Sequence, residues 1–232
     1  MYSNPDIDVQ SSGTTLSQHV YKTFGLMFIG LMVTFLTSYL LYQTNLVYYI
    51  IGSYTMLSLV ILVVQLGVVF SLVRRLHSMS ITSARVMFLA YSILTGISFS
   101  VLGLIYDAGS IYLAFGVTAV FFGALSVIGF TTKLNMSKFA PVLFIGLIML
   151  VIVNVMGIFF DFSGMERIIC SAGILLFTGI TVYDTQKMKA LYMANQGDEE
   201  MLSRLSIYSA FDLYLDFINI FIYILRMLGN RD

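Results

Sequence analysis

The fold is decided by residues 205–227, which read Leu-Ser-Ile-Tyr-Ser-Ala-Phe-Asp-Leu-Tyr-Leu-Asp-Phe-Ile-Asn-Ile-Phe-Ile-Tyr-Ile-Leu-Arg-Met. A helix of about 20 mostly apolar residues can cross a bilayer. Polar residues recur in this stretch at spacings of three and four, so they share one face of a helix. Because that face cannot meet lipid, we predict that this helix lies at the centre of a bundle. The members of this polar stripe are Ser209, Asp212, Asp216, Asn219, Tyr223 and Arg226.

The composition places the chain in a membrane. Of the 232 residues, 59% are hydrophobic and 10% are charged, with a mean hydropathy of +0.92, whereas a soluble domain carries about 25% charged residues. The formal net charge of zero argues against a nucleic-acid partner. The lone Cys170 excludes an intrachain disulfide and a cysteine-based metal cluster. We therefore expect an integral membrane protein in a lipid bilayer, without a bound cofactor.

Six further apolar runs precede residues 205–227. The expected fold is all-α, a bundle of seven transmembrane helices with the seventh at its centre. The first 20 residues are polar and lack the basic start of a signal peptide, so the first run should remain as an anchor. We expect a polar tail at 1–19, one helical domain at 20–228, a short tail at 229–232 and the longest link at 187–204. The runs are Val20–Leu41, Val47–Val73, Ala84–Tyr106, Ile111–Thr131, Phe139–Phe160, Arg167–Tyr183 and Leu205–Met227.

Basic residues give the orientation. They gather in the links after the second, fourth and sixth runs, and the positive-inside rule places those links in the cytoplasm. The N-terminus is then cytoplasmic, and the short links favour a bacterial plasma membrane. Seven full spans place the C-terminus outside, whereas Arg226 and Arg231 favour a re-entrant last segment, so both topologies stay open. The basic residues in these links are Arg74, Arg75, Arg85, Lys133, Lys138, Lys187, Lys189 and Arg204.

Two other residue sets have structural interpretations. His19 and His77 lie at the edges of apolar runs, without ligand partners at helical spacing, and are expected to be solvated. Small residues in the fourth run let helix backbones approach each other. Packing against a neighbouring helix is expected of Ala119, Gly123, Ser126 and Gly129.

Two aspartates mark the functional site, because a carboxylate at membrane depth is costly. Asp216 lies within the polar stripe and Asp184 near the end of the sixth helix, so antiparallel neighbours could bring them together. Two carboxylates in contact cannot both ionise freely, so such a pair can sense pH near neutrality. Their oxygens also suit Ca²⁺. We predict a pH sensor, gate and Ca²⁺ site at Asp184 and Asp216. The competing interpretation of Asp184 is an exposed acid paired with Lys187 or Lys189.

Two arginines and the rest of the stripe complete the predicted site. Arg74 and Arg75 end the second run on the same side as Asp184. One of them is predicted to hold Asp184 as a charge-assisted latch of the closed state, while plain anchoring is the alternative. The stripe is predicted to line the path, and the alternative is a hydrogen-bonded seam that only fixes packing. The pore-lining residues are Ser209, Asp212, Asn219 and Tyr223.

These motifs resemble a known family. Residues 213–226, Leu-Tyr-Leu-Asp-Phe-Ile-Asn-Ile-Phe-Ile-Tyr-Ile-Leu-Arg, resemble the C-terminal signature of the Bax inhibitor-1 family. Residues 182–189, Val-Tyr-Asp-Thr-Gln-Lys-Met-Lys, resemble the end of that family's sixth helix, and Gly-Ile-Ser-Phe at 96–99 also fits. The resemblance covers the chain from the first helix to the last. It implies a seven-helix bundle with the last helix at its centre and a pH-sensitive Ca²⁺ leak.

The resemblance also implies roles for individual residues. The paired aspartates of the family correspond to Asp184 and Asp216, and its latch arginine corresponds to Arg74 or Arg75. Asp212 departs from the family's pattern, in which a small or neutral polar residue is more usual. A third carboxylate there could shift the titration of the pair or add a Ca²⁺ ligand.

Several functions use the same aspartates. We expect a channel-like protein that is no enzyme and whose partners are Ca²⁺ and protons. A proton-coupled cation exchanger is the alternative. An intramembrane aspartyl protease would pair Tyr-Asp with Gly-x-Gly-Asp and a later Pro-Ala-Leu, whereas this chain reads Leu-Tyr-Leu-Asp at 213–216 and has prolines only at positions 5 and 141. A non-conducting partner-binding protein is the last reading, for which no soluble interaction module is evident.

Overall fold

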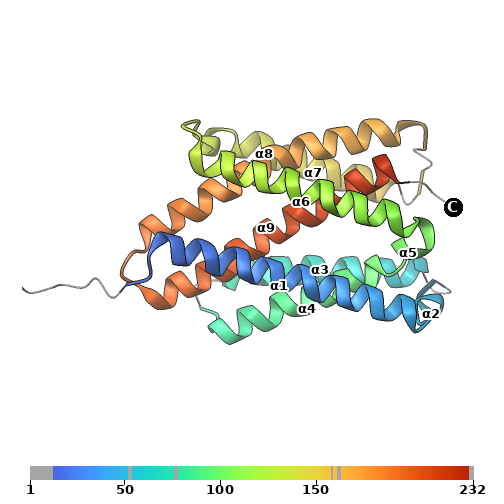
Figure 1. Ribbon diagram of the computed structural model, residues 1–232, viewed down its shortest axis with the longest axis horizontal. Coiled ribbons are helices and arrows are strands. Elements are labelled where there is room, and N and C mark those ends of the chain that lie inside the picture. The colour runs from blue at the N-terminus through green and yellow to red at the C-terminus, as the bar shows by residue number, and fades with distance from the viewer. Residues whose placement is uncertain (1–12, 52–53, 76–77, 158, 161–162, 230–232) are drawn as a thin grey trace, which may run out of the picture.

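The computed structural model describes residues 13–51, 54–75, 78–157, 159–160 and 163–229. Within these ranges the secondary structure is helical and contains no β-strand, and most long helices run roughly along the long axis of the molecule (Figure 1). Predictions for His77, Arg231 and most of both tails lie outside these ranges. The α-helices are α1 (Leu16–Gln43), α2 (Val47–Ile51), α3 (Tyr54–Arg75), α4 (Ile81–Phe99), α5 (Leu102–Ile105), α6 (Ala108–Thr131), α7 (Ala140–Met156), α8 (Glu166–Ala194) and α9 (Glu199–Leu228), with short 3-10 turns at Met136–Lys138 and Ser163–Met165.

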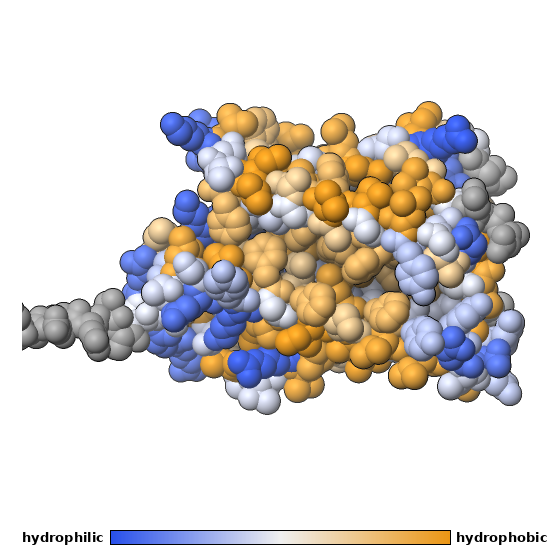
Figure 2. Space-filling view, in the orientation of Figure 1, coloured by the Kyte–Doolittle hydropathy of each residue, from blue (hydrophilic) through white to orange (hydrophobic). Residues whose placement is uncertain are grey.

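Among the residues that the structure describes, four segments are long and apolar enough to cross a membrane. They are α1, the segment Ile81–Ile105 that comprises α4 and α5, α6, and α8. The 17-residue α7 is apolar but shorter. Figure 2 shows apolar surface between two ends where hydrophilic residues gather. A helical membrane protein is therefore confirmed, while the number of seven spans stays a prediction.

The third predicted run is divided into two helices, α4 and α5. The described parts of the second run are α2 and α3, on either side of residues 52–53, which lie outside the described ranges. Between α4 and α5 the Ser100 hydroxyl donates to the carbonyl of Ile97 at 2.7 Å. The apolar composition of a run predicts contact with lipid, but it does not show where the backbone turns.

The predicted long link at 187–204 is wrong. Helix α8 continues to Ala194 and α9 begins at Glu199, so only four residues connect them. Gly197 makes the turn with φ of +94°, a left-handed conformation that glycine adopts without steric cost. Asp198 caps α9 by accepting a hydrogen bond from the Met201 amide at 2.9 Å. The prediction failed because the helices extend beyond the apolar runs into polar sequence.

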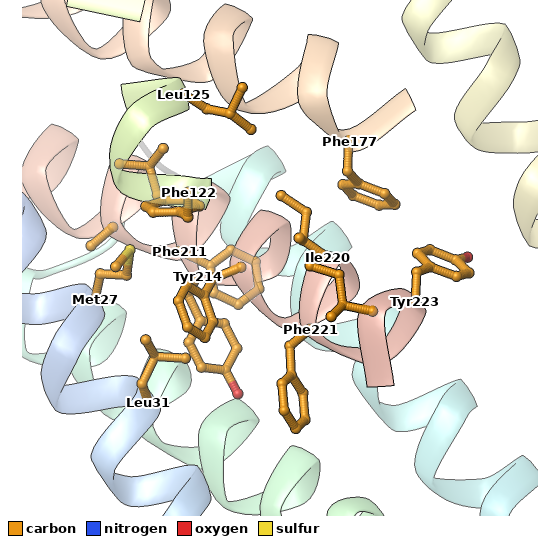
Figure 3. Packing of buried hydrophobic residues seen from close by; sticks show 14 of the residues in the cluster. Met27, Leu31, Phe122, Leu125, Phe177, Phe211, Tyr214, Ile220, Phe221 and Tyr223 are labelled. Carbon is orange, nitrogen blue, oxygen red and sulfur yellow. The ribbon is translucent and has the colours of Figure 1, made fainter. Parts of the chain in front are cut away.

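Helix α9 is the centre of the bundle, as predicted. It packs against α1, α4, α6 and α8, and Figure 1 shows it between them. With 30 residues it is about 45 Å long, which is enough to cross a hydrocarbon core of about 30 Å. Aromatic side chains fill its contacts with α4: the Phe211 ring lies 4.9 Å from the Tyr91 ring, and the Tyr214 ring lies 5.4 Å from the Phe88 ring. Figure 3 shows Phe211 and Tyr214 among core residues from neighbouring helices.

The small residues of α6 have two different environments. Gly129 and Ser126 are buried, and a Cβ on Gly129 would lie 2.6 Å from the Cβ of Thr185 on α8. Ala119 and Gly123 are exposed, and nothing lies within 4 Å of a Cβ on Gly123. The predicted packing is therefore correct for Ser126 and Gly129 and wrong for Ala119 and Gly123, because these two lie on a face of α6 that none of the described helices covers.

Candidate functional site

Asp216 lies on the side of α9 that packs against α8. The residue is 2% exposed, and its Oδ2 has no hydrogen-bond partner among the described residues. The hydroxyl of Thr181 lies beside its carboxylate, and Asp184 and Asp212 are close enough to repel it. A buried carboxylate oxygen without a partner is costly, so this group favours a bound proton or an additional cation.

Lys187 on α8 joins the other two aspartates. Its Nζ lies 2.8 Å from Oδ2 of Asp212 and 3.7 Å from Oδ1 of Asp184. It also donates a hydrogen bond to the Tyr208 hydroxyl at 2.9 Å and lies 4.6 Å from the centroid of the Tyr208 ring. Oxygens from both helices therefore surround the ammonium group. We call Asp184, Lys187, Tyr208, Asp212 and Asp216 the α8–α9 cluster.

The connection between α8 and α9 explains why these residues meet. The two helices are antiparallel, and the turn at Gly197 joins them. Lys187 and Tyr208 lie at nearly equal distances along the chain on either side of that turn, and Asp184 and Asp212 lie one helical turn further away from it. Residues at spacings of three and four share a helix face. The cluster is therefore a direct result of the sequence spacing on both sides of the short connection.

The cluster contains more carboxylates than cations. Its three aspartates face one ammonium group, and within the described ranges Lys187 is the basic residue that interacts electrostatically with all three. The side chains are largely shielded from solvent, with exposed fractions of 27% for Lys187, 11% for Asp184 and 16% for Asp212. Like charges held this close cannot all ionise freely. The cluster can therefore accept a proton or a cation.

The predicted arginine latch is not formed in this arrangement. Arg74 and Arg75 are exposed at the end of α3, which packs mainly against α4, and neither forms an ion pair with a described carboxylate. The cation that contacts Asp184 is Lys187, which was the competing interpretation. That interpretation named the right partner of Asp184, but it expected an exposed carboxyl group. The Asp184 side chain is instead largely buried, because α9 covers the end of the predicted sixth span.

The rest of the polar stripe divides among separate partners. The Asn219 amide donates to the carbonyl of Leu215 in its own helix at 2.7 Å. The Tyr223 hydroxyl accepts a hydrogen bond from the Asn154 amide of α7 at 3.1 Å. Ser209 is buried at 3% exposure. At Ser209, Asn219 and Tyr223 the contacts therefore agree better with the alternative prediction, a seam that fixes helix packing, than with a stripe that lines a continuous polar path.

Another ion pair lies toward the other end of α9. The Nε of Arg226 lies 3.1 Å from Oε1 of Glu166, at the start of α8. Arg226 also approaches the Asn154 side chain, with 3.5 Å between its guanidinium nitrogen and Oδ1. This end of the stripe therefore ties α9 to α7 and α8.

Sequence reasoning missed Tyr208 and the environment of His19. Tyr208 lies one helical turn before Asp212, so its spacing was a usable signal. His19 was predicted to be solvated, which is wrong: it is fully buried, its Nδ1 lies 3.0 Å from the Ser206 hydroxyl, and its ring lies 5.5 Å from that of Tyr192. Tyr192 lies in the part of α8 that extends beyond the predicted sixth run and was predicted to be a loop, whereas Ser206 lies at the start of the predicted seventh run.

The predicted Ca²⁺ ligation at Asp184 and Asp216 stays a prediction. In the described part of the chain, no group of three or more His, Cys, Asp or Glu side chains is arranged to hold a metal ion. Ca²⁺ takes six to eight oxygen ligands. Any Ca²⁺ at the cluster would therefore keep water ligands or require movement of the side chains.

Comparisons with known proteins agree with the architecture. The sequence profile of the family described as "Inhibitor of apoptosis-promoting Bax1" matches residues 16–232. The chain is 37% identical to a protein of Borreliella burgdorferi over 210 residues, 90% of each chain. It is 32% identical to the Escherichia coli inner membrane protein YbhL over 217 residues, 93% of each chain. It is also 32% identical to the Rickettsia prowazekii protein RP147 over 216 residues, 93% of this chain and 91% of the relative. The chain is therefore a membrane protein of the Bax inhibitor-1 family.

Proposed function

We propose that this protein is a pH-sensitive Ca²⁺ leak channel, with seven spans, a cytoplasmic N-terminus and a bacterial plasma membrane as its location. The observation that carries the proposal is Asp216, a buried carboxylate with an unpartnered oxygen in the central helix. A charge held this deeply in a membrane bundle is costly and is typical of an ion or proton pathway. The inner-membrane name of YbhL supports the location.

Asp184 and Asp216 form the proposed gate. The ionised carboxylates of Asp184 and Asp212 hold Lys187 between α8 and α9, and these contacts keep the two helices together. Protonation removes the negative charge of a carboxylate and weakens its attraction to the ammonium group. Protons bind as pH falls, so the closed contact weakens and the leak increases below neutral pH. Arg74 and Arg75 keep their proposed latch role only in an arrangement that brings the end of α3 to Asp184.

The test is Ca²⁺ flux through purified protein in liposomes that contain a fluorescent Ca²⁺ indicator, measured on both sides of neutral pH. Asp216→Asn keeps the shape of the side chain and removes its charge, as a bound proton does, so we expect a Ca²⁺ flux that responds less to pH. Glu200→Gln is the matched control, because Glu200 lies on the same helix with a side chain 67% exposed. Equal flux and equal pH response in wild type and Asp216→Asn would refute the proposal.

A proton-coupled exchanger is the second candidate, because the unpartnered Asp216 oxygen is also a site for a transported proton. In an exchanger, Ca²⁺ entry moves protons outward in a fixed ratio. A pH indicator inside the same liposomes measures that ratio. A fixed ratio that persists when the membrane potential is clamped supports exchange, and Ca²⁺ flux without proton movement supports the leak.

A further inference from the structure

We propose that Lys187 is a built-in competitor of the transported cation, so that its ammonium group must leave the α8–α9 cluster before a divalent ion can bind there. This inference rests on the proposed Ca²⁺ pathway and assigns a selectivity role to one residue within it. Lys187 was expected only as a cytoplasmic anchor or as a surface partner of Asp184. Its place between two helices indicates more than either role.

The first argument is the position of the ammonium group. Nζ contacts carboxylate oxygens of Asp184 and Asp212 and the hydroxyl of Tyr208, at 3.7, 2.8 and 2.9 Å. These oxygens are hard ligands of the type that Ca²⁺ prefers. Because Lys187 and a divalent ion carry charges of the same sign, they cannot both use these oxygens. Occupation by one excludes the other.

The second argument is the charge that Lys187 leaves uncompensated. Asp216 is 2% exposed, has an unpartnered Oδ2 and interacts with Asp184, Asp212 and Lys187. One ammonium group therefore serves three carboxylates. A cation with two charges balances this set better than one lysine, so the cluster would bind it once the lysine is absent.

The third argument concerns Asp212. Its Oδ2 makes the shortest contact to Lys187, so the additional carboxylate holds the lysine in place. Lysine is a point charge on a flexible stem, and it can swing away from Asp184 while keeping one partner. Lys187 can therefore compete with a divalent cation for the oxygens of the cluster while its ammonium group stays bound to Asp212.

The experiment is Tb³⁺ binding to the full chain in detergent. Tb³⁺ substitutes for Ca²⁺ and is excited through nearby tyrosines, and the chain has no tryptophan to add background, while Tyr208 lies within the cluster. Lys187→Gln should lower the Tb³⁺ concentration for half-saturation at least about tenfold, because it removes a charge of the same sign at contact distance. Excess Ca²⁺ should displace the Tb³⁺. Lys187→Arg keeps the charge and should bind like the wild type.

The matched control is Lys189→Gln, the same substitution two residues further along α8, at a lysine that forms no ion pair with a described carboxylate. It should leave Tb³⁺ binding unchanged. Equal half-saturation in wild type and Lys187→Gln would overturn the inference and leave Lys187 as a structural clamp. If Lys187→Gln does not fold, the double variant Lys187→Gln/Asp212→Asn replaces it, because it removes one positive and one negative charge together. The double variant should bind Tb³⁺ more tightly than Asp212→Asn alone, and equal binding by these two variants would overturn the inference.

Flux in liposomes separates this inference from the proposed function. Lys187→Gln should raise Ca²⁺ flux, and Asp216→Asn should weaken the response of the flux to pH. If Asp216→Asn leaves the flux and its pH response unchanged while Lys187→Gln still gains Tb³⁺ affinity, the leak function fails and the competition stands. If Asp216→Asn weakens the pH response while Lys187→Gln changes neither flux nor Tb³⁺ binding, the competition fails and the leak function stands.

Discussion

Gly129→Ala tests the close contact between α6 and α8 at Thr185, the residue next to Asp184 of the cluster. A Cβ at position 129 would lie 2.6 Å from the Cβ and 2.9 Å from the Cγ2 of Thr185. Ordinary carbon contacts are about 3.5–4.0 Å, so α6 and α8 must separate by on the order of 1 Å. Thr185 cannot easily rotate away, because it is fully buried and its hydroxyl donates to the carbonyl of Thr181 at 2.8 Å.

The expected loss of stability follows from two opposing effects. Inserting a methyl group into a packed interior costs about 1–3 kcal/mol, and contact with the Cβ of Thr185 places Gly129→Ala in the upper part of that range. Alanine favours the helix over glycine by about 1 kcal/mol. The net loss is about 1–2 kcal/mol, which corresponds to a decrease in Tm of about 2–8 °C for a chain of this size. Gly123→Ala has the same helix gain without the clash, so its Tm should stay equal or rise.

The assay uses the lone cysteine. Cys170 is fully buried, so a thiol-reactive fluorogenic dye labels it only when the bundle unfolds. Heating wild type, Gly129→Ala and Gly123→Ala in the same detergent gives the three Tm values. Equal Tm values for the two variants would show that the α6–α8 contact tolerates a methyl group, and the reasoning from the close approach would be wrong. A lower Tm for Gly129→Ala with an altered Ca²⁺ flux would link this contact to the cluster.

Three further predictions concern the ends of the helices. Gly197→Ala should lower Tm, because an alanine at φ of +94° is strained by about 1–2 kcal/mol. Gly197→Asn should lower Tm less, because asparagine tolerates this backbone conformation better. Equal decreases in Tm for the two variants would contradict backbone strain as the cause. A double-mutant cycle of Arg226→Gln and Glu166→Gln should give a coupling of about 0.2–1 kcal/mol, because the pair is partly exposed; zero coupling would remove it as a tie between α8 and α9. Hydrogen bonds from Ser110 lower the pKa of the Asp107 carboxyl below its ordinary value of 3.8, so its contribution to stability is present above that pH and is lost as pH falls through the lowered pKa. Asp107→Asn should flatten this acid loss in thermal scans, and an unchanged profile would contradict the cap.

The sequence predicted the helices better than their connections. Apolar runs of about 20 residues follow from the thickness of the bilayer, so α1, α6 and α8 were placed correctly in their apolar parts. The turn at Gly197 was missed because residues 187–204 are polar, and polarity was read as a loop. A helix that continues into water satisfies its backbone hydrogen bonds internally and needs no lipid. The contact of His19 with Tyr192 depends on the extension of α8, so it could not be predicted before that extension.

The central helix was predictable because its polar face cannot meet lipid, whatever the neighbouring helices are. The partners of that face were less predictable, because spacing shows which residues share a face and does not show what lies opposite. Asn219 bonds to its own helix and Tyr223 to α7, so one regular stripe contains several unrelated contacts. Among the described members of the stripe, Asp216 alone has a buried oxygen without a partner. Asp216, which differs from the other stripe residues in this way, is therefore the better functional candidate.

Asp212 shows why charges on two helices have to be interpreted together. From the sequence of α9 alone it is an additional acid that either shifts a titration or binds Ca²⁺. Its contact with Lys187 at 2.8 Å gives it a different role, since a carboxylate that already has a cation is a weaker ligand for another. The additional acid therefore adds no net negative charge to the cluster when Lys187 is counted with it. What it adds is a fixed position for a positive charge beside Asp184 and Asp216. A relative with a neutral residue at this position would need Lys187 to be absent, or held by another acid, to keep the same balance.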